Sequence, residues 1–364
     1  MKTTMITGAD GHIGKALVSW LLKNSYDELL LLVRGKDREQ GKRKIQALGA
    51  LADNARCRVE FVELTEANPF AGISPQGISR IIHSAAATSF AVERQTAMTV
   101  NVEGTRKLVE FAEQCENLQR FCFISSLYTA GLQEGIIDES CTSEEPEFAN
   151  FYEWSKWQAE QIIVNRSNLP WHIYRVATVI GEDDSGRVVQ QNAIHNTLRL
   201  LYYGLLSVVP GQPDTRVYIA STEFVVNAIG ALLESESGNS VFHVCESGED
   251  AIRLSEVIDI VYETFSQDAR FAGMNLLKPL YCDRESFDTL MSAIQSLDSV
   301  ALQSLQSVAP FAPQLYSDKE LLTTETRKTI PCSRPSCTRS LLSAVASKLV
   351  ESRWGIRQTE EMSL

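Results

Sequence analysis

The sequence predicts an α/β protein: a doubly wound parallel β-sheet with helices on both faces and a smaller, mostly helical C-terminal lobe. Short apolar runs alternate with helix-like segments through the first part of the chain, as in a parallel sheet covered on both faces. The first run is followed at once by a glycine-rich turn and a helix. The chain has 364 residues, enough for one large domain and a smaller lobe.

The expected elements alternate in type up to about residue 181. The strands are short apolar runs bounded by turn residues, at 3–8, 28–35, 58–64, 78–87, 118–126 and 171–181. Between them lie segments whose apolar residues recur at helical spacing, at 13–24, 36–51, 100–115 and 152–166. Because most of these apolar strands are followed by a helix, we expect them to pair in parallel.

The regular alternation of predicted strands and helices ends at about Gly181. A short strand at 239–247 could join the sheet edge, and residues 278–364 are mostly helix-like and rich in Ser and Gln. Further helices are expected at 194–206, 222–236 and 253–265. We therefore expect a core at residues 1–185 and a substrate-binding lobe at residues 186–364, with some elements of the lobe returning to the core.

Charge and composition exclude several classes of protein. The formal net charge of -12 argues against binding to nucleic acid, which needs a positive field. No apolar stretch reaches the roughly 20 residues that span a bilayer, and the start MKTTMITGAD lacks a secretory h-region. A cytoplasmic location without a transmembrane segment is therefore expected. The eight cysteines include no CxxC pair, and the histidines show no ligand spacing, so no metal site is predicted.

The stretch TGADGHIG carries glycines at positions 8, 11 and 14, between the first strand and the first helix. Glycine permits a tight turn, a close approach of backbone N–H groups to a pyrophosphate, and close contact between helix and strand. The positive end of the helix then points at the phosphates. In this context the glycines predict a Rossmann-type dinucleotide site rather than an ordinary βα turn.

The residue that ends the second strand bears on the choice of dinucleotide. Enzymes that prefer NAD usually hold a carboxylate there to bond the ribose 2′-hydroxyl, whereas this chain has Arg34. A guanidinium attracts a 2′-phosphate and can bond it through two N–H groups. Three further basic residues, Lys36, Arg43 and Lys44, add positive charge nearby, although a solvated basic helix face would also explain some of them. We expect NADPH as the cofactor.

Tyr152 and Lys156 lie four residues apart on an expected helix and therefore share one face. A neighbouring ammonium is expected to lower the pKa of the phenol and let it exchange a proton near neutrality. Ser126 ends the fifth strand, at the edge where open α/β sheets bind ligands. A serine there is often only a turn cap, but together these residues predict a catalytic Ser–Tyr–Lys set.

These motifs resemble the extended short-chain dehydrogenase/reductase superfamily over about residues 3–181. The matching segments, in the expected order, are TGADGHIG, HSAAA, NVEGT, FISSLYTAG, YEWSK and YRVATVIG. Within the superfamily the chain is most similar to the thioester reductase and fatty acyl reductase branch. The segments that carry this similarity are LLLLVRGKDREQGKRKI, IIHSAAATSF, VEFAEQCENLQRFCFISSLYTAG and VPGQPDTRVYIASTEFVVNAI.

The resemblance implies a role for each matching position. The residues that it places along the pyrophosphate, with the last in helix packing, are Thr7, Gly8, Ala9, Gly11, His12, Ile13 and Gly14. It assigns the 2′-phosphate to Arg34 and Lys44 and the adenine to Glu63 and Leu64. The residues that it places along the rest of the cofactor or behind the active site are His83, Ser84, Ala85, Ala86, Asn101 and Val176. It makes Ser126 the catalytic hydroxyl, Tyr152 the proton donor and Lys156 the ligand of the nicotinamide ribose.

Two departures from the family pattern concern the substrate side. Arg175 is followed by Val176 where the family usually has proline, and the usual VPVDYV-like segment reads IASTEFV. The resemblance implies an NADPH-dependent reductase of an acyl thioester, bound to coenzyme A or a carrier protein, that yields an aldehyde or alcohol. The alternatives are an NADP-dependent ketone or alcohol oxidoreductase, a sugar-nucleotide epimerase or dehydratase, and a non-catalytic NADP-binding regulator.

The C-terminal segment CTRSLLSAVASKLVESRW has apolar residues near helical spacing. These residues are Leu341, Leu342, Val345, Leu349 and Trp354. Such a stripe is typical of a helix packed on its own lobe, and less often of a helix that binds a partner or a membrane surface.

Overall fold

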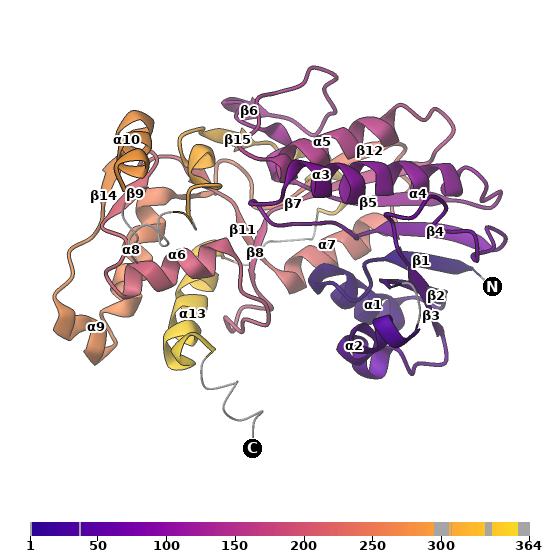
Figure 1. Cartoon of the computed structure of the whole chain (residues 1–364), viewed down its shortest axis with the longest axis horizontal. Helices are drawn as coiled ribbons and strands as arrows, with labels where there is room; N and C mark the ends of the chain where they lie inside the picture. Colours follow the sequence, from indigo (N-terminus) through magenta and orange to yellow (C-terminus); the bar gives the residue numbers. More distant parts are fainter. Residues whose placement is uncertain (1, 36–37, 295–305, 307, 332–336, 356–364) are drawn as a thin grey trace.

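A computed structural model describes residues 2–35, 38–294, 306, 308–331 and 337–355. Its centre is a seven-stranded sheet in the order β12-β7-β5-β4-β1-β2-β3, with parallel pairing between neighbours (Figure 1). The strands are β1 (Thr3–Thr7), β2 (Glu28–Arg34), β3 (Cys57–Val62), β4 (Ile78–His83), β5 (Arg120–Ser126), β7 (Trp171–Val176) and β12 (Ser240–Val244). The order changes direction between β1 and β4, so this switch point is where a ligand is expected.

Helices cover both faces of the sheet and confirm the doubly wound fold (Figure 1). One face packs on α1 (His12–Asn24), α2 (Arg38–Leu48) and α7 (Thr222–Leu233). The other packs on α4 (Gly104–Ala112) and α5 (Phe151–Val164), and the π-helical turn η2 (Ala97–Glu103) contacts both of these helices. Neighbouring residues of β1 divide between the two cores, Met5 on the α4 side and Ile6 on the α1 side. The side-chain period of two thus produces two buried faces from one continuous apolar run.

Two expected elements differ in the structure. The strand expected at 171–181 is two strands, because the chain leaves the sheet after Val176 and β8 (Thr178–Gly181) pairs with β11 (Ile219–Ser221) instead. The helix expected at 100–115 begins earlier, with α3 (Arg94–Thr96), and passes through the wider turn η2 before α4. Such π-helical turns are frequent at functional sites, and Asn101 lies in this one.

The C-terminal part forms a lobe with its own buried cluster. Its helices are α6 (Ala193–Tyr202), α8 (Leu254–Phe265), α9 (Ala269–Met274), α10 (Arg284–Ile294) and α13 (Thr338–Glu351). Short strand pairs join them, namely β9 (Val208–Pro210) with β14 (Leu280–Cys282) and β10 (Arg216–Val217) with β13 (Ile252–Arg253). The five apolar residues of the C-terminal stripe are buried, and α13 packs on α8. The stripe therefore belongs to a helix packed on its own lobe.

Several late segments return to the core. The strand expected at 239–247 is β12, at the edge of the sheet, and α12 (Thr324–Thr329) lies against it. β15 (Lys319–Leu321) pairs with β6 (Gly135–Ile137), which follows the short helix η3 (Leu127–Ala130). A boundary near residue 185 stays a prediction, as does the cytoplasmic location. Among the helices of the described residues, none is long and apolar enough to cross a membrane.

Candidate active site

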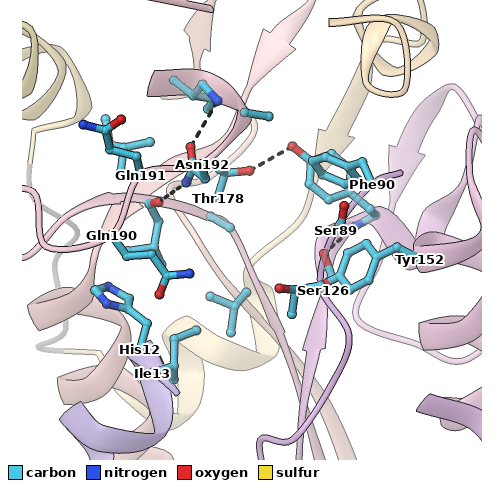
Figure 2. Close-up of a pocket in the computed structure, with 18 of the residues that line it drawn as sticks. His12, Ile13, Ser89, Phe90, Ser126, Tyr152, Thr178, Gln190, Gln191 and Asn192 are labelled. Carbon is cyan, nitrogen blue, oxygen red and sulfur yellow. Dashed lines mark hydrogen bonds between the residues drawn. The ribbon is translucent and has the colours of Figure 1, made fainter. Parts of the chain in front are cut away.

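A cavity of about 710 Å³ lies at the carboxyl ends of the central strands, between the core and the lobe (Figure 2). Nine of the sequence-predicted site residues line it: Gly11, His12, Ile13, Ser84, Ala86, Ser126, Tyr152, Lys156 and Val176. The predicted residues that do not line it are Thr7, Gly8, Ala9, Gly14, Arg34, Lys44, Glu63, Leu64, His83, Ala85 and Asn101. The structure thus brings the Ser–Tyr–Lys set and the glycine turn to one cavity, at the switch point of the sheet.

The glycine turn is packed so closely that side chains have no room. A Cβ atom on Gly14 would lie 2.1 Å from the Gly8 carbonyl oxygen, and one on Gly8 would lie 2.7 Å from the Ala85 nitrogen. Gly8 also has a φ of +66°, which favours glycine. α1 begins at His12 with Gly11 as its N-cap, and no side chain caps it. Its first N–H groups therefore face the cavity, as a pyrophosphate cradle requires.

Gly14→Ala is expected to weaken binding of the expected dinucleotide by about 5- to 150-fold, because overpacking of this kind costs about 1–3 kcal/mol. The atom that a new Cβ meets is backbone, so the turn itself must shift. Calorimetry measures the dissociation constant. Gly72→Ala is the matched control, since a Cβ there meets nothing within 4 Å. Equal affinities of Gly14→Ala and wild type would contradict the assignment of the turn.

A chain of hydrogen bonds supports the glycine turn from behind. Thr105 donates to the Asn101 carbonyl at 2.6 Å, so the His83 Nε2 at 3.0 Å donates to Thr105. The His83 Nδ1 then accepts from the Thr7 hydroxyl at 2.7 Å, and that oxygen accepts from the Ala85 N–H at 3.2 Å. Burial, and then the charge of Lys156, lower the pKa of His83 to about 3. A neutral His83 therefore connects the turn to the helix behind it.

His12 connects the glycine turn to α7 and to the end of β8. Thr222 donates to the Gly181 carbonyl, so the His12 Nε2, 2.8 Å from the Thr222 hydroxyl, acts as donor to it. The same nitrogen lies 3.3 Å from a Glu182 carboxylate oxygen. His12 therefore holds the start of α1 against residues 181–182, which also line the cavity.

The two basic residues predicted for the 2′-phosphate lie in different environments. Arg34 ends β2 and is exposed, and the contacts between described residues include no partner for its guanidinium. Lys44 forms an ion pair with Asp10 in the glycine turn. This pair brings the ammonium of α2 to the edge of the turn. Leu64 is buried against Gly104, whereas the Glu63 carboxylate accepts hydrogen bonds from Thr65.

Ser126 of β5 and Tyr152 of α5 lie close together at one end of the cavity (Figure 2), and Lys156 of α5 lines it too. Asn150 caps α5 by accepting from the Glu153 N–H at 3.1 Å, which fixes the first turn of the helix that carries Tyr152. Ser126 accepts from the Tyr128 N–H at 3.3 Å. The turn cap that the sequence offered as an alternative for Ser126 is therefore present, and its hydroxyl also faces the cavity.

The expected lowering of the Tyr152 pKa is wrong for this structure. Burial raises the pKa of Tyr152 to about 12, although a hydrogen bond with Ser126 acts in the opposite direction. The Lys156 ammonium is engaged elsewhere, since it donates to the Ile124 carbonyl at 2.7 Å and lies 4.5 Å from the Phe123 ring centroid. The phenol therefore keeps its proton at neutral pH, which is the form that a proton donor needs.

Lys156 is a buried amine whose pKa differs from its usual value. Burial lowers its pKa to about 7, while the Glu160 carboxylate one turn further along α5 raises it. Perturbed groups of this kind concentrate at functional sites. Lys156 and Tyr152 line the same cavity. Their side chains can therefore donate hydrogen bonds to the oxygen atoms of a ligand, and the phenol can give one of them a proton.

Comparisons with known proteins give the family of the chain. Residues 6–229 match the model of the NAD-binding family described as Male sterility protein. The chain belongs to this family. Glycine betaine reductase ATRR of Emericella nidulans is 24% identical over an alignment of 266 residues, and the match covers 67% of this chain and 21% of that protein. Fatty acyl-CoA reductase wat of Drosophila melanogaster is 22% identical over an alignment of 274 residues, and the match covers 63% of this chain and 53% of that protein.

A solved structure shows the same fold as this member of the Male sterility protein family. It is the terminal R domain from the myxalamid PKS-NRPS biosynthetic pathway, with a TM-score of 0.78 and 21% identity over 97% of this chain and 92% of that one. The chain spans about a fifth and about half of the lengths of the two curated relatives. The matches confirm the resemblance to the extended short-chain dehydrogenase/reductase superfamily and its thioester and fatty acyl reductase branch, and they support an oxidoreductase.

This Male sterility family member has site residues that sequence reasoning did not find. An aromatic wall of Phe90, Tyr128 and Phe311 lines the cavity beside Tyr152. Phe90 and Tyr128 each follow a central strand at its carboxyl end, a position that could have indicated them. Phe311 lies in the segment PFAP, far along the chain, and no local signal connects it to this site.

Proposed function

We propose that the chain is an NADPH-dependent reductase of an acyl thioester, which it converts to an aldehyde or an alcohol. The observation that carries the proposal is that Ser126, Tyr152 and Lys156 line the same cavity as the glycine turn. A polar set of this kind beside a dinucleotide cradle suits the reduction of a carbonyl. Family membership supports the choice of a thioester.

The residues present fit a phosphorylated nicotinamide dinucleotide. A Cβ at Gly8 or Gly14 would collide with neighbouring backbone atoms, so the tight turn that a pyrophosphate needs depends on both glycines. The guanidinium of Arg34, for which the described residues offer no partner, would hold the 2′-phosphate. Lys156 would bond the nicotinamide ribose. The reduced cofactor, when bound, supplies the hydride.

The side chains of the site provide two things to the carbonyl. The hydroxyls of Ser126 and Tyr152 donate hydrogen bonds to its oxygen and stabilise the negative charge that develops there. Tyr152 then supplies the proton, and its pKa of about 12 means that it is protonated at neutral pH. When the carbon–sulfur bond breaks, the carbonyl re-forms as an aldehyde, and the proton that Tyr152 gave to the oxygen leaves with the sulfur as the thiol.

The nature of the thiol is part of the proposal. One relative is named as a fatty acyl-CoA reductase and one structural neighbour as a terminal R domain of a PKS-NRPS pathway. Both coenzyme A and an acyl carrier protein are therefore suitable carriers of the substrate. The aromatic wall beside Tyr152 offers apolar surface for the acyl group.

The test incubates the protein with NADPH and acyl thioesters of several chain lengths, on coenzyme A and on a carrier protein. We expect consumption of NADPH, release of one thiol and formation of aldehyde or alcohol. A protein that releases no thiol and forms no aldehyde or alcohol from any of these thioesters would refute the proposal. Turnover of ketones or sugar nucleotides instead would favour another member of the superfamily.

Arg34→Ala is expected to weaken NADPH binding by about 10- to 150-fold and to leave NADH binding unchanged, because hydrogen bonds to a charged group contribute about 1.5–3 kcal/mol. Fluorescence titration with both cofactors measures the ratio. Arg58→Ala controls for net charge, since Arg58 is an exposed arginine on β3. If Arg34→Ala lost affinity for both cofactors equally, Arg34 would not be the 2′-phosphate ligand.

A further inference from the structure

We call residues 308–321 the capping segment. It leads from the lobe past the cavity to α5, the helix that carries Tyr152. Pro310 and Phe311 of this segment line the cavity. The Phe311 ring lies 5.5 Å from that of Phe90 and 5.8 Å from that of Tyr128, between centroids. Phe90 in turn makes an edge contact with Tyr152, at 5.6 Å. Phe311 is thus one ring removed from the proposed proton donor.

A buried amide fixes the capping segment to α5. Gln314 donates from Nε2 to Glu153 Oε2 at 2.9 Å and to the Gly131 carbonyl at 3.2 Å, and its Oε1 accepts from Lys319 Nζ at 2.9 Å. Both ends of the amide are used, so its orientation is defined. Glu153 is fully buried and directly follows Tyr152 in sequence. The network therefore connects the helical turn of the proton donor to the segment that carries Phe311.

Glu153 and Asn150 hold the same segment from the start of α5. Glu153 accepts from the Ala149 N–H at 3.0 Å and from Asn150 Nδ2 at 2.9 Å. That Asn150 amide also donates to the Pro310 carbonyl at 3.2 Å. Pro310 immediately precedes Phe311, so this bond restrains the backbone beside the ring.

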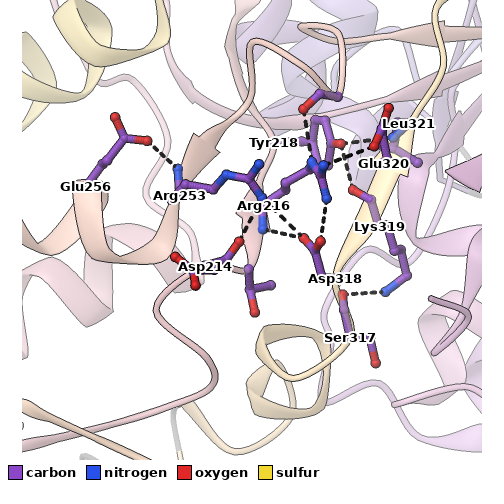
Figure 3. A network of polar contacts seen from close by, with 12 residues as sticks. Asp214, Arg216, Tyr218, Arg253, Glu256, Ser317, Asp318, Lys319, Glu320 and Leu321 are labelled. Atoms are coloured by element: carbon purple, nitrogen blue, oxygen red, sulfur yellow. Dashed lines mark hydrogen bonds and ion pairs between the residues drawn. The ribbon is translucent and has the colours of Figure 1, made fainter. Parts of the chain in front are cut away.

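The far end of the capping segment is fixed by charge (Figure 3). Arg216 forms ion pairs with Asp318 and, at 3.0 Å, with Glu320. The Tyr218 hydroxyl donates to the Lys319 carbonyl at 2.7 Å and accepts from the Leu321 N–H at 2.9 Å. Both ends are therefore anchored, and Phe311 is held in place against the aromatic wall.

We propose that Phe311 determines which acyl groups the site accepts, and that Glu153 and Gln314 are the residues that position it. This inference rests on the proposed thioester reductase function. A fixed ring near the reacting carbon leaves room for a straight chain but contacts a branch next to the carbonyl. Removing the ring opens that space, whereas releasing Gln314 lets the ring move.

The test compares octanoyl-CoA with 2-ethylhexanoyl-CoA, which have equal numbers of acyl carbons. We expect wild type to prefer the straight chain. Phe311→Ala is expected to raise kcat/KM for the branched thioester relative to the straight one by about tenfold or more, since a single methylene group in a pocket accounts for about 10- to 200-fold. Phe287→Ala is the matched control for the loss of a ring, because Phe287 is a buried phenylalanine of α10 that does not line the cavity. Its ratio is expected to equal that of wild type. Phe311→Leu replaces Phe311→Ala if the latter does not fold.

Gln314→Leu tests the positioning role. We expect it to shift the same ratio in the same direction, through a higher KM for octanoyl-CoA with kcat within a few-fold of wild type. A purely structural role would lower the amount of active protein and leave KM and the ratio unchanged. Gln267→Leu, an exposed glutamine after α8, is the control.

The outcomes separate the two proposals. If wild type reduces the straight thioester but Phe311→Ala or Phe311→Leu leaves the ratio unchanged, the specificity role of Phe311 is refuted and the reductase function stands. If the ratio changes for Phe311 but not for Gln314→Leu, the positioning role is refuted. If wild type reduces no thioester at all, the proposed function fails and this inference fails with it.

Discussion

Tyr152→Phe is expected to lower turnover by about 10²- to 10⁴-fold while NADPH affinity stays within a few-fold of wild type. The substitution removes one hydroxyl, and with it the proton donor, a role that contributes a factor of this size in enzymes. It leaves in place the ring, which packs on Phe90. Single-turnover kinetics with a thioester measure the loss, and calorimetry measures the affinity.

Tyr128→Phe is the matched control, because Tyr128 lines the same cavity and also contacts Phe90. Its hydroxyl lies 2.9 Å from Thr178 rather than beside Ser126. We expect its removal to change turnover by no more than a few-fold. Equal losses in the two variants would mean that the tyrosines act by packing, and a Tyr152→Phe protein with full activity would exclude Tyr152 as the donor.

The parts of the fold that the sequence predicted correctly are those set by local pattern. The apolar run of β1 predicts a strand buried on both faces, and Met5 and Ile6 enter different cores. The glycine turn is predictable because only glycine fits where a Cβ would lie 2.1 Å from a carbonyl oxygen. In both places a short stretch of sequence contains the whole physical reason.

The end of β7 shows where local pattern fails. Residues 171–181 read as one apolar strand, but Thr178 donates its N–H to the Tyr218 carbonyl at 3.2 Å, outside the central sheet. The partner strand comes about 40 residues later, from β11. Strand propensity is the same in either sheet, so only the tertiary pairing decides where the chain leaves.

The sequence predicted which residues make up the Ser–Tyr–Lys set, but not the pKa values of the tyrosine and the lysine. Spacing places Tyr152 and Lys156 on one face of α5, and the structure agrees. The pKa of each depends on burial and on which carbonyl the ammonium reaches, here that of Ile124. Those quantities depend on β5 and the lobe. The same is true of Phe311, whose ring neighbours Phe90 and Tyr128 lie about 180 to 220 residues earlier in the chain.

Arg175→Met is expected to lower the free energy of unfolding by about 3–5 kcal/mol, because it leaves the Glu160 carboxylate buried without its partner. Arg175 donates to Glu160 through two bonds, at 3.1 and 2.8 Å, and both side chains are almost completely buried. Urea unfolding measures the change. Arg339→Met is the control, since its pair with Glu256 is partly exposed, and exposed pairs contribute only about 0–1 kcal/mol.

Loss of the Arg175–Glu160 pair should also affect the active site, because Glu160 contacts the residue next to Ser126. Ser125 donates to Glu160 at 2.6 Å, next to Ser126, and the Glu160 charge raises the pKa of Lys156. The double variant Glu160→Leu with Arg175→Met has no uncompensated buried charge. It should therefore be more stable than Arg175→Met alone. Without the Glu160 charge, the pKa of Lys156 falls. As the pH is raised, the double variant should therefore lose activity at a lower pH than wild type does. A double variant less stable than Arg175→Met would show that the pair acts through packing and the Ser125 bond rather than through charge.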